Sequence, residues 1–447
     1  MDKAPSEKTE ESSEVQSTPP IDEPLDAQSD SREEISHPMA VHGWQIISND
    51  EQLENALERA REEDRLLLLL IRSKSCLNSG ELEGELISRE ELHEESSRFV
   101  RLALDVDTRI GLELTSLHRV PISPFLLILN EDGTEAARLD GKTPTADLVR
   151  SLGAIADGRG TLSEMKLAAS ENPFDIHLAY ELGRQNALRG NAIEAKRHFA
   201  RIFVLRRKLT YSPRTIVRGI ADVGRVGDPS DFGPVRSLVE SDLAGLHEEV
   251  DTLIASSYFV LANHLYLCHR KDYTQALRLL EELRRRFPDS PEARRAGLSL
   301  AMVHHRLGST TNSRDEMSRF LSDSARDPRA IAQAFLTAAE IDPLRALVME
   351  TIDVHLERHH DSARLWAAAA RLLEVEGDIT SAVAAARRAS DLNPESNWQK
   401  RELARLEDEL SELNDESSPL EEDSKENDSK PEASSRLRND GCSINQL

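Results

Sequence analysis

The sequence contains little cysteine. Its 447 residues include three cysteines, Cys76, Cys268 and Cys442, which lie far apart. No two of them have the CxxC spacing, and no cysteines and histidines have the spacing of a zinc site. This pattern argues against a disulfide framework and favours a reducing compartment.

Long apolar runs are also missing. The longest, Leu66–Ile71, is far too short to cross a bilayer. The first sixteen residues, MDKAPSEKTEESSEVQ, lack the apolar stretch of a signal peptide. We therefore expect a soluble cytoplasmic protein that has no membrane partner.

Positive charge is in deficit, with 56 Lys and Arg against 81 Asp and Glu and a net charge of −25. Residues 1–40 carry −8 of this charge and residues 411–447 carry −6, and both segments are rich in Ser, Pro, Glu and Asp. Such segments are predicted to be disordered acidic tails. The short basic run Arg284-Arg285-Arg286 has no aromatic residues interleaved with it, so no nucleic acid partner is expected.

Cofactor and metal signatures are absent as well. The sequence has no phosphate loop, no nucleophile elbow and no dinucleotide fingerprint. The pairs His304-His305 and His359-His360 do not predict a metal site, because adjacent residues on a helix point in different directions. We expect neither a cofactor nor a metal.

What the sequence does contain begins with an alternation of short apolar strands and helices. It predicts an α/β domain over residues 41–157. Apolar runs followed by turn or capping signals place the strands, and two capping boxes, at residues 48–51 and 88–91, mark helix starts. The predicted strands are 44–47, 66–71, 99–106, 125–130 and 135–139.

Cys76 is the strongest candidate for chemistry. It follows the buried strand 66–71 and precedes a predicted helix at 80–87, whose N-terminus would stabilise a thiolate, as would Lys74. The motif Cys76-Leu77-Asn78-Ser79 is CxxS, so Ser79 cannot serve as a resolving thiol. The stretch 73–76 can also be read in the reverse register, SxxC, if the helix begins later; loop length favours Cys76 in the first, exposed place.

The order of these elements and the pair Ser123-Pro124 before the hairpin resemble the thioredoxin family. The resemblance implies a cis bond at Ser123-Pro124 that faces the thiol and pairs with substrate. It makes Cys76, Ser79 and Pro124 the candidate redox site. Two features depart from the family: Ser75 replaces the usual Trp, and the central strand lacks the buried Asp. An inert thioredoxin fold therefore stays open.

From residue 158 to residue 410 the pattern changes to helix pairs with a period near 34 residues, which is similar to the tetratricopeptide repeat. Segments 205–255 and 325–360 are predicted to be helical but degenerate. Four copies can be recognised. Their characteristic residues are Trp366, Ala370, Gly377, Ala382 and Pro394 in the clearest copy; Leu182, Gly183, Gly190, Ala195 and Phe199; Leu267, Tyr273, Ala276 and Pro288; and Leu300, Ala301, Gly308 and Phe320.

The two predicted domains together resemble the bacterial chaperedoxin (YbbN-type) co-chaperones, which pair an altered thioredoxin domain with helical repeats. The resemblance implies a protein-binding scaffold or holdase whose repeats bind unfolded clients or a chaperone. Cys76 would form optional mixed disulfides with those clients. The alternative is a monothiol thiol-disulfide oxidoreductase in redox homeostasis, and a third hypothesis is an adaptor with an inert thioredoxin fold.

Overall fold

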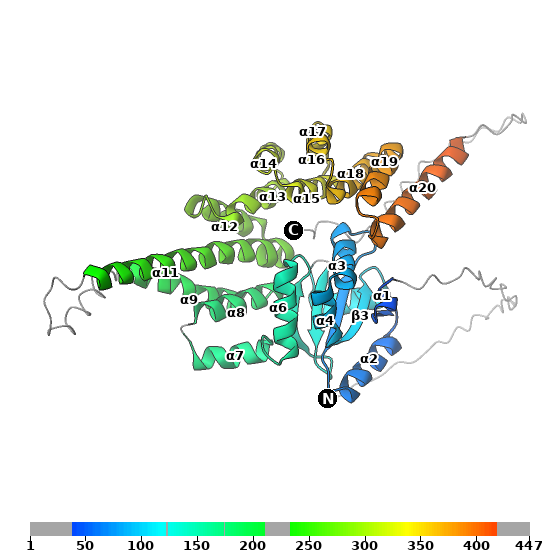
Figure 1. The fold of residues 1–447 in the computed structure, drawn as a ribbon. Helices are drawn as coiled ribbons and strands as arrows, with labels where there is room; N and C mark the ends of the chain where they lie inside the picture. The colour runs from blue at the N-terminus through cyan, green and yellow to red at the C-terminus, as the bar shows by residue number, and fades with distance from the viewer. Residues whose placement is uncertain (1–37, 122–123, 174, 211–232, 418–447) are drawn as a thin grey trace, which may run out of the picture. The chain divides into compact units, whose positions relative to one another are not determined.

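A five-stranded mixed sheet forms the base of the α/β part of the chain (Figure 1). A computed structural model describes residues 38–121, 124–173, 175–210 and 233–417. The strand order across the sheet is β1-β3-β2-β4-β5, in which β1, β3 and β2 run parallel and β4 and β5 are antiparallel. The strands are β1 (Gln45–Ile47), β2 (Leu67–Arg72), β3 (Val100–Asp105), β4 (Phe125–Leu129) and β5 (Glu135–Asp140).

The two central strands are apolar along their whole length because helices cover both faces of the sheet. Every residue of β2 and of β4 is buried. Leu68 and Leu70 pack on the face covered by α3, α4 and α6, whereas Leu67 and Leu69 pack on the face covered by α2 and α5. These helices are α2 (Asp50–Glu62), α3 (Leu77–Ser88), α4 (Glu90–Ser97), α5 (Arg109–Leu117) and α6 (Thr145–Ala156).

The N-termini of α2 and α4 can be compared with the two predicted capping boxes. Asn49 accepts a hydrogen bond from the backbone N–H of Gln52 at 3.0 Å, and Ser48 donates its own N–H to the Gln52 side chain at 2.8 Å. The capping box of α2 is therefore formed one residue later than predicted. The second capping box, predicted at residues 88–91, is not formed, because α4 begins at Glu90 with Arg89 as its N-cap residue and no side chain there makes a capping hydrogen bond.

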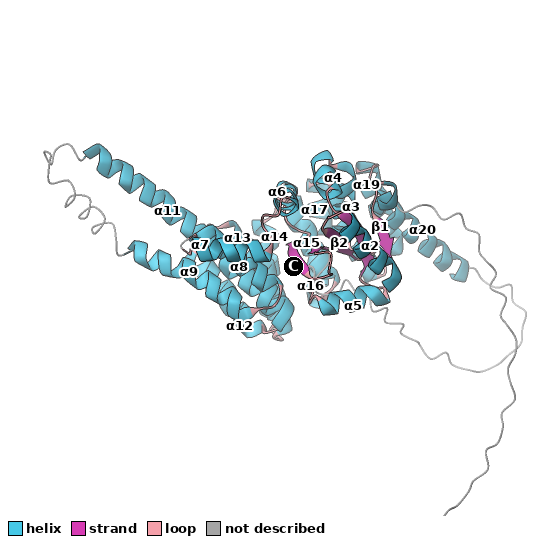
Figure 2. Cartoon of the chain, turned by 90° about the horizontal axis from the view of Figure 1, so that it is seen from below, coloured by secondary structure: helices cyan, strands magenta, loops and turns pink. Residues whose placement is uncertain are grey.

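Beyond α6 the described chain is helical, as Figure 2 shows by the confinement of strands to one region. The helices pack as neighbouring pairs, among them α8 with α9, α13 with α14 and α18 with α19. They are α7 (Leu162–Glu171), α8 (Ile176–Leu188), α9 (Ala192–Thr210), α11 (Gly233–Val260), the π-helix η2 (Leu261–Arg270), α12 (Tyr273–Arg286), α13 (Pro291–Arg306), α14 (Thr310–Asp323), α15 (Pro328–Ala339), α16 (Asp342–Met349), α17 (Ile352–Arg358), α18 (Ala363–Glu376), α19 (Ile379–Leu392) and α20 (Asn397–Ser417).

Small residues let the paired helices approach closely, as the repeat pattern predicts. At Gly183 in α8 an added Cβ would lie 2.5 Å from the ring of Phe199 in α9, so only glycine fits there. The predicted fold class, a thioredoxin-like α/β part followed by helical hairpins, is confirmed. Residues 211–232 of the predicted degenerate segment 205–255 lie outside the described residues.

The α/β part and the helices share their cores. Leu188 of α8 and Cys268 of η2 pack in the cluster on one face of the sheet, and Leu77 of α3 packs in the core of helices α13–α18. The described residues from Pro38 onward accordingly belong to one compact unit. Cys268, predicted within a repeat helix, thus contributes to the sheet core as well, and its burial raises the pKa of its thiol to about 12.

The predicted tails are shorter than the sequence pattern indicates. Helix α1 (Pro38–Val41) begins within the predicted N-terminal tail, and α20 continues to Ser417 within the predicted C-terminal one. The remaining tail predictions, for residues 1–37 and 418–447 including Cys442, fall outside the described residues. Among the residues that are described, none of the helices is both long enough and apolar enough to cross a membrane.

Candidate functional site

Cys76 lies at the mouth of α3. Strand β2 ends at Arg72, and a three-residue loop leads to Cys76, which is the N-cap residue of the helix. The helix begins at Leu77, three residues earlier than predicted, and the backbone N–H of Gly80 donates to the Cys76 carbonyl at 3.0 Å. A cysteine directly before the first helical residue favours the CxxS register over SxxC.

The predicted exposure of Cys76 is wrong. Its exposed fraction is 0%, and neighbouring Ser79 is also 0% exposed. The loop and the first turn of α3 pack against helices from the other end of the chain, which the sequence pattern does not reveal. A reagent or a client therefore cannot reach the thiol unless these contacts open.

Ser79 stabilises the loop. Its Oγ accepts a hydrogen bond from the backbone N–H of Ser73 at 3.2 Å, and both residues are buried. A buried N–H without a hydrogen-bond partner destabilises the folded state. Ser79 therefore has a structural role, as the acceptor for the Ser73 N–H, in the position that a resolving cysteine would occupy.

Pro124 lies directly before β4 and is buried. Because Phe125 is opposite Ile71 in the antiparallel pair of β4 and β2, Pro124 lies beside the end of β2, where the Cys76 loop begins. Its carbonyl accepts a hydrogen bond from the N–H of Gly141 at 3.2 Å. Ser123, and with it the predicted cis bond, lies outside the described residues.

Helix α20 packs on the first turn of α3 (Figure 1). The indole N–H of Trp398 donates to the carbonyl of Lys74 at 3.2 Å. The Trp398 ring occupies the space beside Gly80, where an added Cβ would lie 2.1 Å from the ring. Glycine in α3 and tryptophan in α20 thus fit each other.

Arginines add a charged layer to this contact. Arg364 of α18 donates to the side-chain oxygen of Asn78 at 2.6 Å and forms an ion pair with Glu81, while Arg401 of α20 lies 3.7 Å from Glu83. We call Arg364, Trp398 and Arg401 the helical cover. Burial lowers the pKa of Arg364 to about 10, and the electrostatic influence of Cys76 acts in the opposite direction.

The charge beside Cys76 therefore differs from the prediction. The ammonium of Lys74 lies 3.6 Å from a carboxylate oxygen of Asp105, and its side chain is largely exposed. Arg364 of α18 is a cation that acts on Cys76 from another element. A thiolate at Cys76 would be stabilised by this guanidinium and by the N-terminus of α3.

A groove of about 770 Å³ lies beside the helical cover. It is lined by α3, by the loop that precedes α6, and by the first residues of α15, α18 and α20. Both charge signs are present along it, including Glu81, Glu85, Arg89, Arg329 and Arg401. The mixed lining suits a polar surface of a protein better than a small molecule of one charge.

The helical cover is not predicted by the sequence pattern. The residues joined by these hydrogen bonds lie 286 and 324 positions apart, and neither a period nor a motif connects them. The position of Trp398 is the one sequence feature that could have indicated a contact of this kind. Trp398 follows the terminating Pro394 of the last recognised repeat, where a large aromatic residue has no helix of its own repeat to pack against.

Comparisons with known proteins agree with the α/β part of this description. Residues 47–131 match a thioredoxin-like family model. No curated protein sequence matches the chain. Among solved structures, a tetratricopeptide repeat protein from Parabacteroides merdae is similar over 59% of this chain and 95% of its own, with 14% identity and a TM-score of 0.24. Yeast Tom70 is similar over 82% of this chain and 67% of its own, with 14% identity and a TM-score of 0.29.

Proposed function

We propose that this chain is a protein-binding scaffold of the holdase or co-chaperone kind. In it the helical hairpins carry the partner surface, and the thioredoxin-like part is a structural module in the resting state. The observation that carries the proposal is the complete burial of Cys76 beneath the helical cover. The helical cover occupies the space beside Cys76 where a substrate of a thioredoxin-like fold would bind. Redox chemistry would therefore require the cover to move, whereas binding of a protein by the helical hairpins would not.

The composition of the helical part supports the same proposal. The stacked pairs place side chains of many short helices side by side, and such arrays form extended surfaces for protein partners. Exposed apolar residues occur along them, including Leu167, Leu307 and Val354. An unfolded client offers the complementary apolar segments.

An aggregation assay with the full chain tests the scaffold. A heat-unfolding enzyme such as citrate synthase is warmed alone and with increasing amounts of the protein, and light scattering is recorded. We expect scattering to fall at a few-fold molar excess, and Cys76→Ser to suppress it as well as the wild type does. Unchanged scattering with both proteins would count against a holdase.

The second candidate is the monothiol oxidoreductase. It is favoured by the position of Cys76 at the N-terminus of α3 and by the nearby guanidinium of Arg364. In this function a partner or client displaces the helical cover and exposes a stabilised thiolate.

Alkylation of Cys76 against pH, in the presence and absence of an unfolded client, separates the two candidates. The oxidoreductase requires that client binding accelerates the reaction and that the pH midpoint lies below about 8.5, the ordinary value for a thiol. Cys76→Ser identifies the signal. If the rate does not change on client addition, only the scaffold keeps its support.

A further inference from the structure

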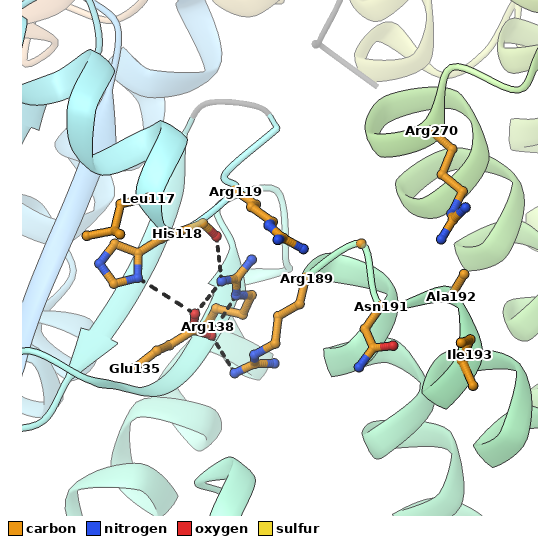
Figure 3. A pocket seen from close by; sticks show the side chains of 11 residues that line it. Leu117, His118, Arg119, Glu135, Arg138, Arg189, Asn191, Ala192, Ile193 and Arg270 are labelled. Atoms are coloured by element: carbon orange, nitrogen blue, oxygen red, sulfur yellow. Dashed lines mark hydrogen bonds and ion pairs between the residues drawn. The ribbon is translucent and has the colours of Figure 1, made fainter. Parts of the chain in front are cut away.

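A second cavity, which shares no lining residue with the Cys76 site, lies between the end of α5, strand β5, the turn from α8 to α9 and the end of η2. Its volume is about 450 Å³, within the range of about 300–1,000 Å³ typical of small-molecule sites. Four arginines line it, as Figure 3 shows: Arg119, Arg138, Arg189 and Arg270.

One carboxylate holds the two inner arginines in place. Glu135 accepts from Arg138 Nε at 2.6 Å and lies 2.5 Å from Arg189 Nη2. Arg138 also donates to the carbonyls of Leu188 and His118, both at 2.8 Å. Arg189 Nη1 donates to the carbonyl and to the side-chain oxygen of Gln185, at 2.8 and 2.7 Å. This network fixes both Arg138 and the mostly buried Arg189 at the wall of the cavity.

The two outer arginines are not balanced by carboxylates. Arg119 and Arg270 are exposed, and within the described part of the chain neither is in an ion pair. Burial lowers the pKa of His118, which keeps it neutral near pH 7. Four guanidinium groups and one carboxylate leave the lining three positive charges in excess, in a chain whose net charge is −25.

The backbone adds to this field. Gly190, Asn191 and Ile193 bring the N-terminus of α9 to the wall, and a helix N-terminus attracts anions. The carboxylate in the first turn of α9, Glu194, pairs with Arg197 at 3.5 Å and does not line the cavity. Arg119 has a φ of +51°, a conformation that glycine adopts at lower cost, so its side chain is presented by a strained turn.

Two exposed apolar side chains flank the arginines. Leu117 is 72% exposed and Ile193 is 78% exposed, and both line the cavity. A purely inorganic anion would leave these side chains without a contact. An organic group attached to the anion would cover them.

We propose that this cavity binds a phosphate-bearing organic molecule. The phosphate group lies between Arg119 and Arg270, beside the wall that holds Arg189, and the organic part lies on Leu117 and Ile193. A phosphomonoester carries about −1.5 to −2 charges and three acceptor oxygens, so several guanidinium groups can contact it at once. A carboxylate, with one charge and two oxygens, satisfies fewer of them.

Calorimetric titration of the full chain with phenyl phosphate at low ionic strength tests the proposal. We expect saturable binding, and about tenfold weaker binding by the double variant Arg119→Gln, Arg270→Gln, which loses two charge-assisted contacts. The control variant is Arg278→Gln, an exposed arginine of α12 that does not line the cavity and should leave the affinity unchanged. Circular dichroism melts confirm that all variants fold.

Two further titrations test the chemical class. The variant Leu117→Ser, Ile193→Ser should weaken phenyl phosphate but not inorganic phosphate, and benzoate, which carries a single carboxylate on the same ring, should bind more weakly than phenyl phosphate at matched ionic strength. Absence of binding by the wild type would overturn the proposal. So would equal weakening by Arg278→Gln, unchanged affinity in the double arginine variant, or benzoate binding as tight as that of phenyl phosphate.

Discussion

Gly80 has no side chain, and the ring of Trp398 uses that space. We expect Gly80→Ala to destabilise the protein by about 1–3 kcal/mol, because the new methyl group would lie 2.1 Å from the ring and force the interface apart. This loss exceeds the gain of about 0.5–1 kcal/mol that alanine normally brings to a helix. Urea unfolding measures the difference.

Gly84 is the matched control, because it lies in the same helix and an added Cβ there meets nothing within 4 Å. Gly84→Ala should be neutral or stabilising. Equal effects of the two substitutions would show that α3 responds to helix propensity alone and that the contact with Trp398 contributes nothing.

His269 couples the stability of the helical part to pH. Burial lowers its pKa to about 4 in the folded state, from an unfolded value near 6.5, while its Nε2 lies 2.8 Å from the carbonyl of Leu188. Below pH 6.5 the unfolded state binds a proton that the folded state does not. The free energy of unfolding should therefore fall by about 1–2 kcal/mol between pH 6.5 and pH 4, allowing for partial solvent screening.

Urea unfolding at pH 7, 5.5 and 4.5 measures this dependence. His269→Gln should make it less steep, whereas His360→Gln, which changes an exposed histidine, should leave it as in the wild type. A His269→Gln curve parallel to that of the wild type would mean that other groups dominate the acid response.

Helix α20 closes the Cys76 site chiefly through Trp398. We expect Trp398→Ala to accelerate alkylation of Cys76 by iodoacetamide at least about tenfold. The buried thiol reacts only when the contact between α20 and α3 opens, so its rate is proportional to the fraction of molecules in the open state. Peptide mass spectrometry follows Cys76 separately from Cys268, whose raised pKa keeps it slow.

The control for this experiment makes the same chemical change in α18. Trp366 donates its indole N–H to the carbonyl of His360, and it lies outside the helical cover. Trp366→Ala should therefore leave the Cys76 rate close to that of the wild type. If both variants accelerate the reaction equally, general destabilisation and not the helical cover controls access.

The elements themselves could be predicted from the sequence, because each depends on local chemistry. The run of leucines before Cys76 forms β2, and the repeat with Trp366 forms α18 and α19. The same pattern places Cys76 between β2 and α3, although α3 begins three residues earlier than predicted and so makes Cys76 its N-cap residue. The burial of Cys76 could not be predicted, because it depends on Trp398, 322 positions away in the chain. The arginine cavity could not be predicted for the same reason, because its residues come from four separate segments of the chain.

For the whole molecule, shared cores determine how it unfolds. Leu77 belongs to the α/β part by sequence but packs in the core of the helical part, and Leu188 does the reverse. Neither part therefore buries its own apolar surface completely, and each stabilises the other. We expect the two parts to unfold together, although chains of this length often unfold in steps.

Leu77→Ala tests this coupling. Removing a fully buried leucine costs about 2–5 kcal/mol. Hydrogen exchange should show this loss equally in the amides of β2 and of α18, because the slowest amides exchange through global unfolding. Leu167→Ala, at a side chain 62% exposed, should cost less than about 0.5 kcal/mol in either element. Loss of protection confined to α18 would show that the helices unfold alone, and that Cys76 is then exposed while the sheet stays folded.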